Sequence, residues 1–297
     1  MKTLYQKMSF LLESITRQTK MYAFILVISN LCFSTQYAKA VNFLDTTISS
    51  KTTDFSSNEV AIISQKLDSA IQNAEKYLNN NMYKNPSYIV LFAKYFQVKK
   101  NLINVNIKEE VVHELIKSKD VNLLQKLYNP TFIYNKLYVQ DVIANMLKIE
   151  KDSIGTLVLI ALHSKQLNKD KYNKLFKLLA KDIQNKYKQT HLYYAIKSIE
   201  KLNIDFLSQE SILIAQNIED VYLPLYMEDK YNEDLYFETL AFLTEFKNPI
   251  LVLDEFHSVI AKQNDDGGFS TEESTQDSCL HPTLLALWYM LNIKNYI

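Results

Sequence analysis

Glycine is scarce in this sequence, with 3 residues in 297, whereas an average protein contains about 7%. So few glycines leave little room for tight turns or phosphate-binding loops, and we expect neither a dinucleotide-binding fold nor a P-loop fold. Two cysteines exclude a disulfide-rich scaffold. The 33 basic and 33 acidic side chains cancel, so no net charge draws the protein as a whole to nucleic acid or to an anionic membrane.

The N-terminus has the order of a secretory signal peptide. Four basic residues and one acidic residue fall in the first twenty positions, an apolar run covers residues 21–33, and Ala38-Lys39-Ala40 follows as a small-x-small cleavage site. That run is shorter than the roughly 20 residues that span a bilayer. We therefore expect residues 1–40 to be removed, leaving no stable membrane span, and the protein to be secreted or extracytoplasmic, in the periplasm or at the cell surface. An uncleaved N-terminal membrane anchor is the alternative.

The mature chain that cleavage after Ala40 would produce is mildly acidic. Cleavage takes five basic residues and one acidic residue, and leaves 28 basic and 32 acidic side chains. One cysteine remains, Cys279, so no internal disulfide is expected and the core must supply the stability. Residues 41–56 are rich in Ser, Thr and Asp and are predicted to form a flexible leader to one folded domain, residues 57–297.

Helical periodicity runs through almost the whole of that domain. Hydrophobic residues make up 47% of the chain and recur at 3.6-residue spacing, with no credible set of alternating strands, so the predicted fold class is all-α. A first helix is expected from Ser57 or Asn58 to a polar stop at Asn79, and Pro86 opens a second. Further helices are expected at residues 107–117, 120–128, 136–149, 152–166, 169–184, 189–203, 208–218, 231–247, 250–263 and 281–293.

Four of these helices are more apolar than their neighbours, and each is paired with a more polar one. Their apolar segments are residues 154–162, 192–196, 235–243 and 284–291. They begin roughly 40 residues apart, which is the length of one helix-turn-helix unit in a repeat protein. Five or six such hairpins, stacked with the apolar helix inside, would form an α/α toroid or an open arc. An irregular all-helical bundle is the alternative.

Two of the three glycines stand together near the C-terminus, in the sequence Gln263-Asn264-Asp265-Asp266-Gly267-Gly268-Phe269. Glycine is needed where the backbone takes a positive φ or where chains approach closely. The pair therefore predicts a sharp corner, anchored by Phe269. A polar loop leads from it into the last apolar helix, with Pro282 in the first turn and Asp277 or Ser278 as the expected N-cap.

This order of Gln-x-x-Asp-Gly-Gly-Phe, a polar loop and an apolar helix beginning near His281 and Thr283 resembles the repeat of the terpenoid cyclase and protein prenyltransferase superfamily. The motif covers residues 261–291, and the resemblance implies an α/α toroid. It carries over no activity, because the Asp-x-Asp-Asp motif of the triterpene cyclases and the thioester sequence of the complement-like members are absent. The prenyltransferases hold zinc with an Asp-x-Cys pair and a later His. Asp277-Ser278-Cys279 matches that pair, but no His follows His281 in this sequence.

Asp277, Cys279 and His281 are acceptable ligand types for zinc. An extended loop could bring them together, whereas a regular helix could not. In the structural alternative Asp277 caps the helix, Cys279 is a small buried apolar side chain and His281 lies at the rim. The acidic loop could hold calcium but lacks the spacing of an EF-hand, so a solvated loop is favoured; its residues are Asp265, Asp266, Glu272, Glu273 and Asp277. We expect no cofactor, with zinc or calcium as the alternatives.

Two functions remain open. In the first, favoured because each catalytic signature is missing or incomplete, the protein binds a protein, a glycan or an apolar small molecule and carries out no chemistry. In the second, it is a toroid-type enzyme that acts on an isoprenoid-like substrate or cleaves a polysaccharide with two carboxylates. The candidate catalytic residues are Asp266, Asp277 and His281. The candidate ligand-binding residues are Asp277, Cys279, His281 and Trp288.

Overall fold

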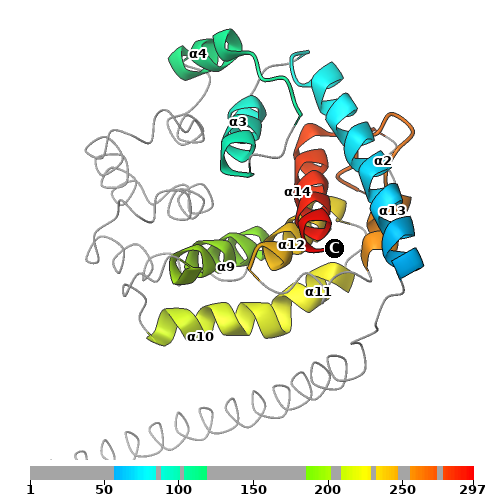
Figure 1. Ribbon diagram of the computed structural model, residues 1–297. Helices are drawn as coiled ribbons and strands as arrows, with labels where there is room; N and C mark the ends of the chain where they lie inside the picture. The colour runs from blue at the N-terminus through cyan, green and yellow to red at the C-terminus, as the bar shows by residue number, and fades with distance from the viewer. Residues whose placement is uncertain are drawn as a thin grey trace, which may run out of the picture. The chain divides into compact units, whose positions relative to one another are not determined.

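The computed structural model describes residues 57–84, 88–100, 104–118, 185–201, 209–228, 232–246, 255–272 and 277–297 (Figure 1). These residues belong to one compact unit, Phe55–Ile297. The predicted signal peptide (1–40) and leader (41–56) lie outside the described residues, and so do the helices expected at 120–128, 136–149, 152–166 and 169–184.

The described part of the chain is almost entirely helical and contains no strand, which confirms the predicted all-α class. Two isolated β-bridges join Asn232 to Glu272 and Phe269 to Cys279. The helices are α2 (Ser57–Asn81), α3 (Tyr88–Lys100), α4 (Glu109–Lys117), α9 (Lys186–Lys201), α10 (Gln209–Asn217), α11 (Leu223–Glu228), α12 (Glu233–Phe246), α13 (Phe256–Ala261) and α14 (Leu280–Tyr296), with a π-helical turn, η3 (Ile218–Tyr222), between α10 and α11.

Two boundaries differ from the sequence prediction. The helix expected to end at residue 218 continues through η3 into α11. Pro224 has no N–H and its ring crowds the carbonyl four residues earlier, and the wider π-helical turn accommodates both effects without ending the helix. The predicted N-cap of the last helix is also wrong. Cys279 is the N-cap and makes no side-chain cap hydrogen bond. The Ser278 hydroxyl instead donates to Asp266 at 2.6 Å and accepts from the Asn264 amide at 2.9 Å.

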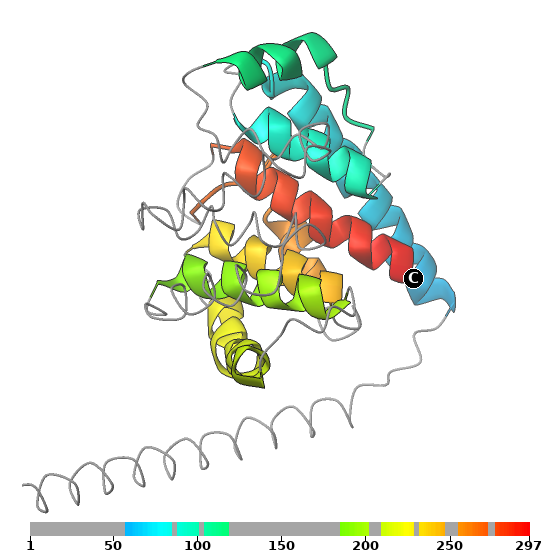
Figure 2. The ribbon, with the colours of Figure 1, turned by 90° about the vertical axis from the view of Figure 1, so that its left-hand side faces the viewer.

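Three of the helices, α9, α12 and α14, pack side by side (Figure 2). They contain the predicted apolar segments 192–196, 235–243 and 284–291, and α12 buries eleven of its fourteen residues, which is typical of a helix covered by others on all sides. An aromatic cluster joins them. Trp288 lies 5.3 to 5.6 Å, between ring centroids, from Phe96, Tyr194 and Phe242.

These three helices run in the same direction. Near their C-terminal ends, the Asn292 amide donates to the Thr244 hydroxyl at 3.1 Å, and Lys201 pairs with Glu245 at 3.2 Å. Near their N-terminal ends, His281 lies against Asp234. Parallel helices that are neighbours in space cannot be joined by a short turn, and the chain returns through α10, η3 and α11 before α12, and through α13 before α14.

Helix α2 lies antiparallel to α14 and packs against it (Figure 1). The Tyr77 hydroxyl, near the end of α2, donates to the Ser278 carbonyl just before α14 at 2.5 Å. At the other end, Lys294 forms an ion pair with Asp68. Among the described residues, no helix is both long enough and apolar enough to cross a membrane.

Candidate functional site

The starts of α9 and α12 are fixed by asparagine caps. The Asn185 Oδ1 accepts from the Lys188 backbone N–H at 3.2 Å, and the Asn232 Oδ1 accepts from the Leu235 N–H at 3.0 Å. Each cap satisfies one of the N–H groups that a first helical turn leaves unpaired. By fixing where each helix begins, these caps determine the direction in which the polar side chains of the first turns of α9 and α12 point.

The Gly267-Gly268 corner lies against α2, as a sharp turn of the kind its sequence predicts. Gly267 has a φ of +88°, and a Cβ at this position would lie 2.4 Å from the Asn73 carbonyl oxygen. A side chain is therefore excluded by both strain and space. The Gln263 amide spans the contact, donating at 2.9 Å to the Ala70 carbonyl of α2 and at 2.9 Å to the Gly267 carbonyl.

The segment that follows the corner holds the starts of α12 and α14 together. The Phe269 carbonyl accepts from the Cys279 N–H at 2.8 Å, and the Phe269 N–H donates to the Thr283 hydroxyl at 2.9 Å. Two residues on, the Thr271 carbonyl accepts from the Asp234 N–H at 3.3 Å. Phe269 is fully buried. The corner motif thus places one polar residue of α12 and the first turn of α14 beside each other.

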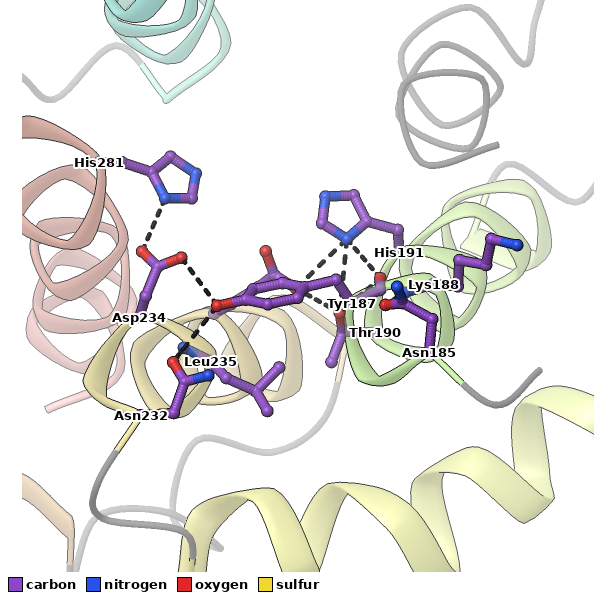
Figure 3. Close-up of polar contacts among 10 residues, drawn as sticks. Asn185, Tyr187, Lys188, Thr190, His191, Asn232, Asp234, Leu235 and His281 are labelled. Carbon is purple, nitrogen blue, oxygen red and sulfur yellow. Dashed lines mark hydrogen bonds and ion pairs between the residues drawn. The ribbon is translucent and has the colours of Figure 1, made fainter. Parts of the chain in front are cut away.

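The first histidine–carboxylate pair joins α14 to α12. The His281 Nδ1 lies 2.7 Å from the Asp234 Oδ1, and the Asp234 Oδ2 accepts from the Tyr187 hydroxyl of α9 at 3.4 Å (Figure 3). The His281 side chain is 33% exposed. On the side of α3, the ring of Phe92 lies 6.2 Å from the His281 ring.

The second pair joins α9 to α12, one helical turn further along α12. The His191 Nδ1 lies 2.7 Å from the Tyr187 carbonyl and 3.3 Å from the Glu238 Oε1. The same Glu238 oxygen accepts from the Thr190 hydroxyl. The Glu238 side chain is 1% exposed. A carboxylate so deeply buried requires these donors, since an unpaired buried charge costs several kcal/mol, on the order of 3–5.

The electrostatics of the cluster favour charged imidazoles. Burial lowers the pKa of His191, but the charge and hydrogen bond of Glu238 outweigh it and the pKa is raised. Burial also lowers the pKa of His281, but its hydrogen bond and ion pair with Asp234 outweigh burial, so the pKa is raised. The neighbouring His191 lowers the pKa of His281 by a smaller amount. Burial raises the pKa of Tyr187 to about 12, so its hydroxyl stays a donor at neutral pH.

The second nitrogen of each ring, Nε2, bonds to no described residue. Figure 3 shows that the Nε2 edges of His191 and His281 both turn away from α12, to the same side. Because each Nδ1 is already held, Nε2 is the atom left for a ligand. It donates a hydrogen bond when the ring is protonated and accepts one when the ring is neutral and the proton is on Nδ1.

The residues predicted as a site from the sequence do not form one cluster. Asp266 folds back on its own corner, accepting from the Gly268 N–H at 3.0 Å and from the Ser278 hydroxyl. Asp277 is exposed, and its carbonyl oxygen lies 3.9 Å from the Cys279 sulfur. His281, the third candidate, turns to Asp234, which the sequence did not single out.

The residues considered as alternative zinc or calcium ligands are likewise not assembled among the described residues. No group of three or more His, Cys, Asp or Glu among the described residues is arranged to hold a metal ion. Burial, with the charges of Asp234 and Asp277, raises the pKa of the Cys279 thiol, which disfavours the thiolate that zinc requires. In the acidic loop Asp265 and Glu272 are exposed, and Glu273 lies outside the described residues.

Trp288, the remaining ligand-binding candidate, lies inside the helix packing. It is 4% exposed. Its Nε1 donates to the Glu245 Oε2 at 3.2 Å, and its ring belongs to the aromatic cluster with Phe96, Tyr194 and Phe242. In this position it supports the packing of α14 against α9 and α12.

Sequence reasoning missed five members of the cluster, which are Tyr187, Thr190, His191, Asp234 and Glu238. Each is polar and lies within the first six residues of a helix that carries one of the apolar segments. The available signal was the polar residues near the start of each apolar helix, since parallel neighbours bring their first turns together.

Comparison with models of known protein families, with curated proteins and with solved structures finds no match. The resemblance to the terpenoid cyclase and protein prenyltransferase superfamily stays a prediction.

Proposed function

We propose that the protein is an exported binding protein whose ligand lies at the N-terminal ends of α9, α12 and α14. The observation that carries the proposal is the pair of imidazoles, His191 and His281, fixed at Nδ1 and directed to one side with Nε2 unbonded to any described residue. The other polar atoms of the cluster are engaged with one another, so these two ring nitrogens are the atoms to which a ligand can bind.

We also propose that the fold is a set of helical hairpins arranged in an α/α toroid or an open arc. This arrangement is supported by the parallel helices α9, α12 and α14, which pack in chain order and are connected through intervening helices. In such an arrangement the first turns of the inner helices share one end. The Gly267 corner, on which the resemblance rests, is the element that brings two of those first turns together.

A panel of three probes tests the binding function. Sulfate, maltotriose and farnesol represent an anion, a neutral glycan and an isoprenoid, and thermal unfolding of the purified protein reports binding to any of them. Binding that is lost in the double variant H191Q/H281Q and kept in H113Q supports the proposal. His113 is a matched control, because its Nδ1 bonds to the Glu109 carbonyl at 2.7 Å as that of His191 bonds to Tyr187. Binding that the double variant leaves unchanged contradicts it.

A second candidate is a toroid-type enzyme, favoured by the 2.7 Å contact of His281 with Asp234. A carboxylate that holds Nδ1 orients the ring and raises its basicity, so Nε2 becomes a general base. The substrates that the sequence suggests are an isoprenoid-like molecule or a polysaccharide. Turnover of either, lowered in D234N with the fold intact, would favour this candidate. Turnover that D234N leaves at the wild-type rate would contradict it.

A further inference from the structure

We propose that His191 and His281 together bind an oxyanion, a carboxylate or a sulfate- or phosphate-type group on the ligand, through their two Nε2–H groups. The inference rests on the proposed function and names the chemistry of the group that the site takes. It assigns a site that spans α9 and α14, whose two rings are 90 residues apart in the sequence.

The hydrogen-bonding inventory determines which ligand group fits. A protonated imidazole is a donor at both nitrogens. The Nδ1 donor of His281 is taken by the Asp234 carboxylate at 2.7 Å. The Nδ1 donor of His191 is shared by the Tyr187 carbonyl at 2.7 Å and Glu238. Two donors remain, one on each ring, both facing away from α12 (Figure 3). A group with two acceptor oxygens, such as a carboxylate or sulfate, matches these two donors in number.

Charge balance at the site also favours an anion. Asp234 offsets the charge of one imidazolium and Glu238 that of the other, so the four side chains are close to neutral together. The N-terminal ends of three helices meet here, and each carries a partial positive charge of about half an elementary charge. The two carboxylates are occupied by His281, Tyr187, Thr190 and His191, so their oxygens do not compete for the Nε2–H donors.

The binding is expected to depend on pH. Asp234 and Glu238 of α12 act on both rings, and His191 also acts on His281, while the side of α3 that faces His281 presents Phe92. Both carboxylates raise the pKa of the rings, which keeps Nε2 a donor further toward neutral pH. Once the rings lose their protons, Nε2 becomes an acceptor and repels the oxyanion.

Calorimetric titration with sulfate tests the inference, because sulfate keeps its charge from pH 5.5 to 8.5. Because binding uses a proton on each of two rings, we expect the affinity to fall by up to about a hundredfold per pH unit above the pKa values of both rings. We expect H191Q and H281Q each to weaken it about tenfold or more at pH 5.5, since each removes one charge-assisted hydrogen bond, whereas H113Q leaves it unchanged. Asp234→Asn is expected to move the loss of binding to lower pH, which a merely structural role would not do.

Acetate and maltotriose complete the experiment. Binding of acetate as well as sulfate supports a carboxylate ligand, and binding of sulfate alone supports a tetrahedral oxyanion. Equal sulfate affinity at pH 5.5 and 8.5, or in H191Q and H281Q, would overturn the inference. Ring-dependent binding of maltotriose with no anion binding would also overturn it while leaving the proposed function intact. Because a variant can misfold, the wild-type protein is also followed by NMR of its five histidines, where the absence of sulfate-induced shifts on His191 and His281 refutes the inference.

Discussion

Replacing Gly267 by alanine is expected to destabilise the protein strongly for so small a change. At a φ of +88°, a side chain costs about 1–2 kcal/mol in strain. The added methyl would also lie 2.4 Å from the Asn73 carbonyl oxygen, so the corner must move off α2. That movement lengthens the hydrogen bonds from Gln263 to Ala70 and from Tyr77 to Ser278, which contribute about 0.5–1.5 kcal/mol each.

The lower entropy of the unfolded alanine chain returns about 0.4–1 kcal/mol. The net loss is then about 2–4 kcal/mol, equivalent to a urea midpoint lower by about 1 M or more at an m-value of roughly 2–3 kcal/mol/M. Trp288 is the single tryptophan of the chain, and its fluorescence reports unfolding. Asp265→Ala is the matched control, because that side chain is exposed and bonds to no described residue. A loss below about 0.5 kcal/mol in Gly267→Ala, equal to that of the control, would refute the reasoning.

Three further predictions concern the cluster and its neighbours. The pKa of His191 and of His281 is raised above the ordinary value of 6.5, so the stability that these rings contribute is fully present below pH 6.5 and is lost as the pH rises through their pKa values in the folded protein. Urea unfolding from pH 5.5 to 8.5 should show this decline in the free energy of unfolding. A free energy of unfolding that does not change with pH, or an identical pH profile in His281→Gln, would contradict the prediction. Trp288→Phe removes the hydrogen bond to Glu245 and part of the ring. We expect it to lower the free energy of unfolding by about 1–3 kcal/mol, measured by thermal or urea unfolding. An unchanged unfolding midpoint would show that this side chain is not part of the packing. Burial raises the pKa of Cys279, so iodoacetamide should label this thiol slowly at pH 7 and faster above pH 9. Labelling at pH 7 as fast as that of a free thiol would contradict the prediction and place Cys279 in an exposed environment.

The fold could be predicted from sequence as far as helix type and rough position. Apolar residues at 3.6-residue spacing fixed α2, α9, α12 and α14 to within a few residues. The continuation of the helix beyond α10 could not be predicted, because Pro224 is normally a helix stop and only the wider turn η3 lets the helix continue into α11. Ser278, a predicted N-cap of α14, bonds instead to Asp266, and the two residues meet only when the corner has folded.

The site was harder to predict, because its partners are far apart in the sequence. His281 was identified through its neighbours Asp277 and Cys279, yet the carboxylate that it meets is Asp234, 47 positions earlier. Glu238 and Thr190 are similarly 48 positions apart. Local spacing carries no information on such pairs. A reader of the sequence would need to place the apolar helices side by side first, and then compare the residues at their starts.

The antiparallel contact of α2 with α14 has a consequence for biosynthesis. Tyr77 and Ser278 are 201 positions apart, and Asp68 and Lys294 are 226 apart. At typical rates of synthesis a ribosome takes about 10–40 s to make that length of chain. Throughout this interval the apolar face of α2, including Leu67, Ala74 and Leu78, has no α14 to cover it. The nascent chain therefore presents this helix to chaperones, and the later synthesis of α14 delays the burial of that face.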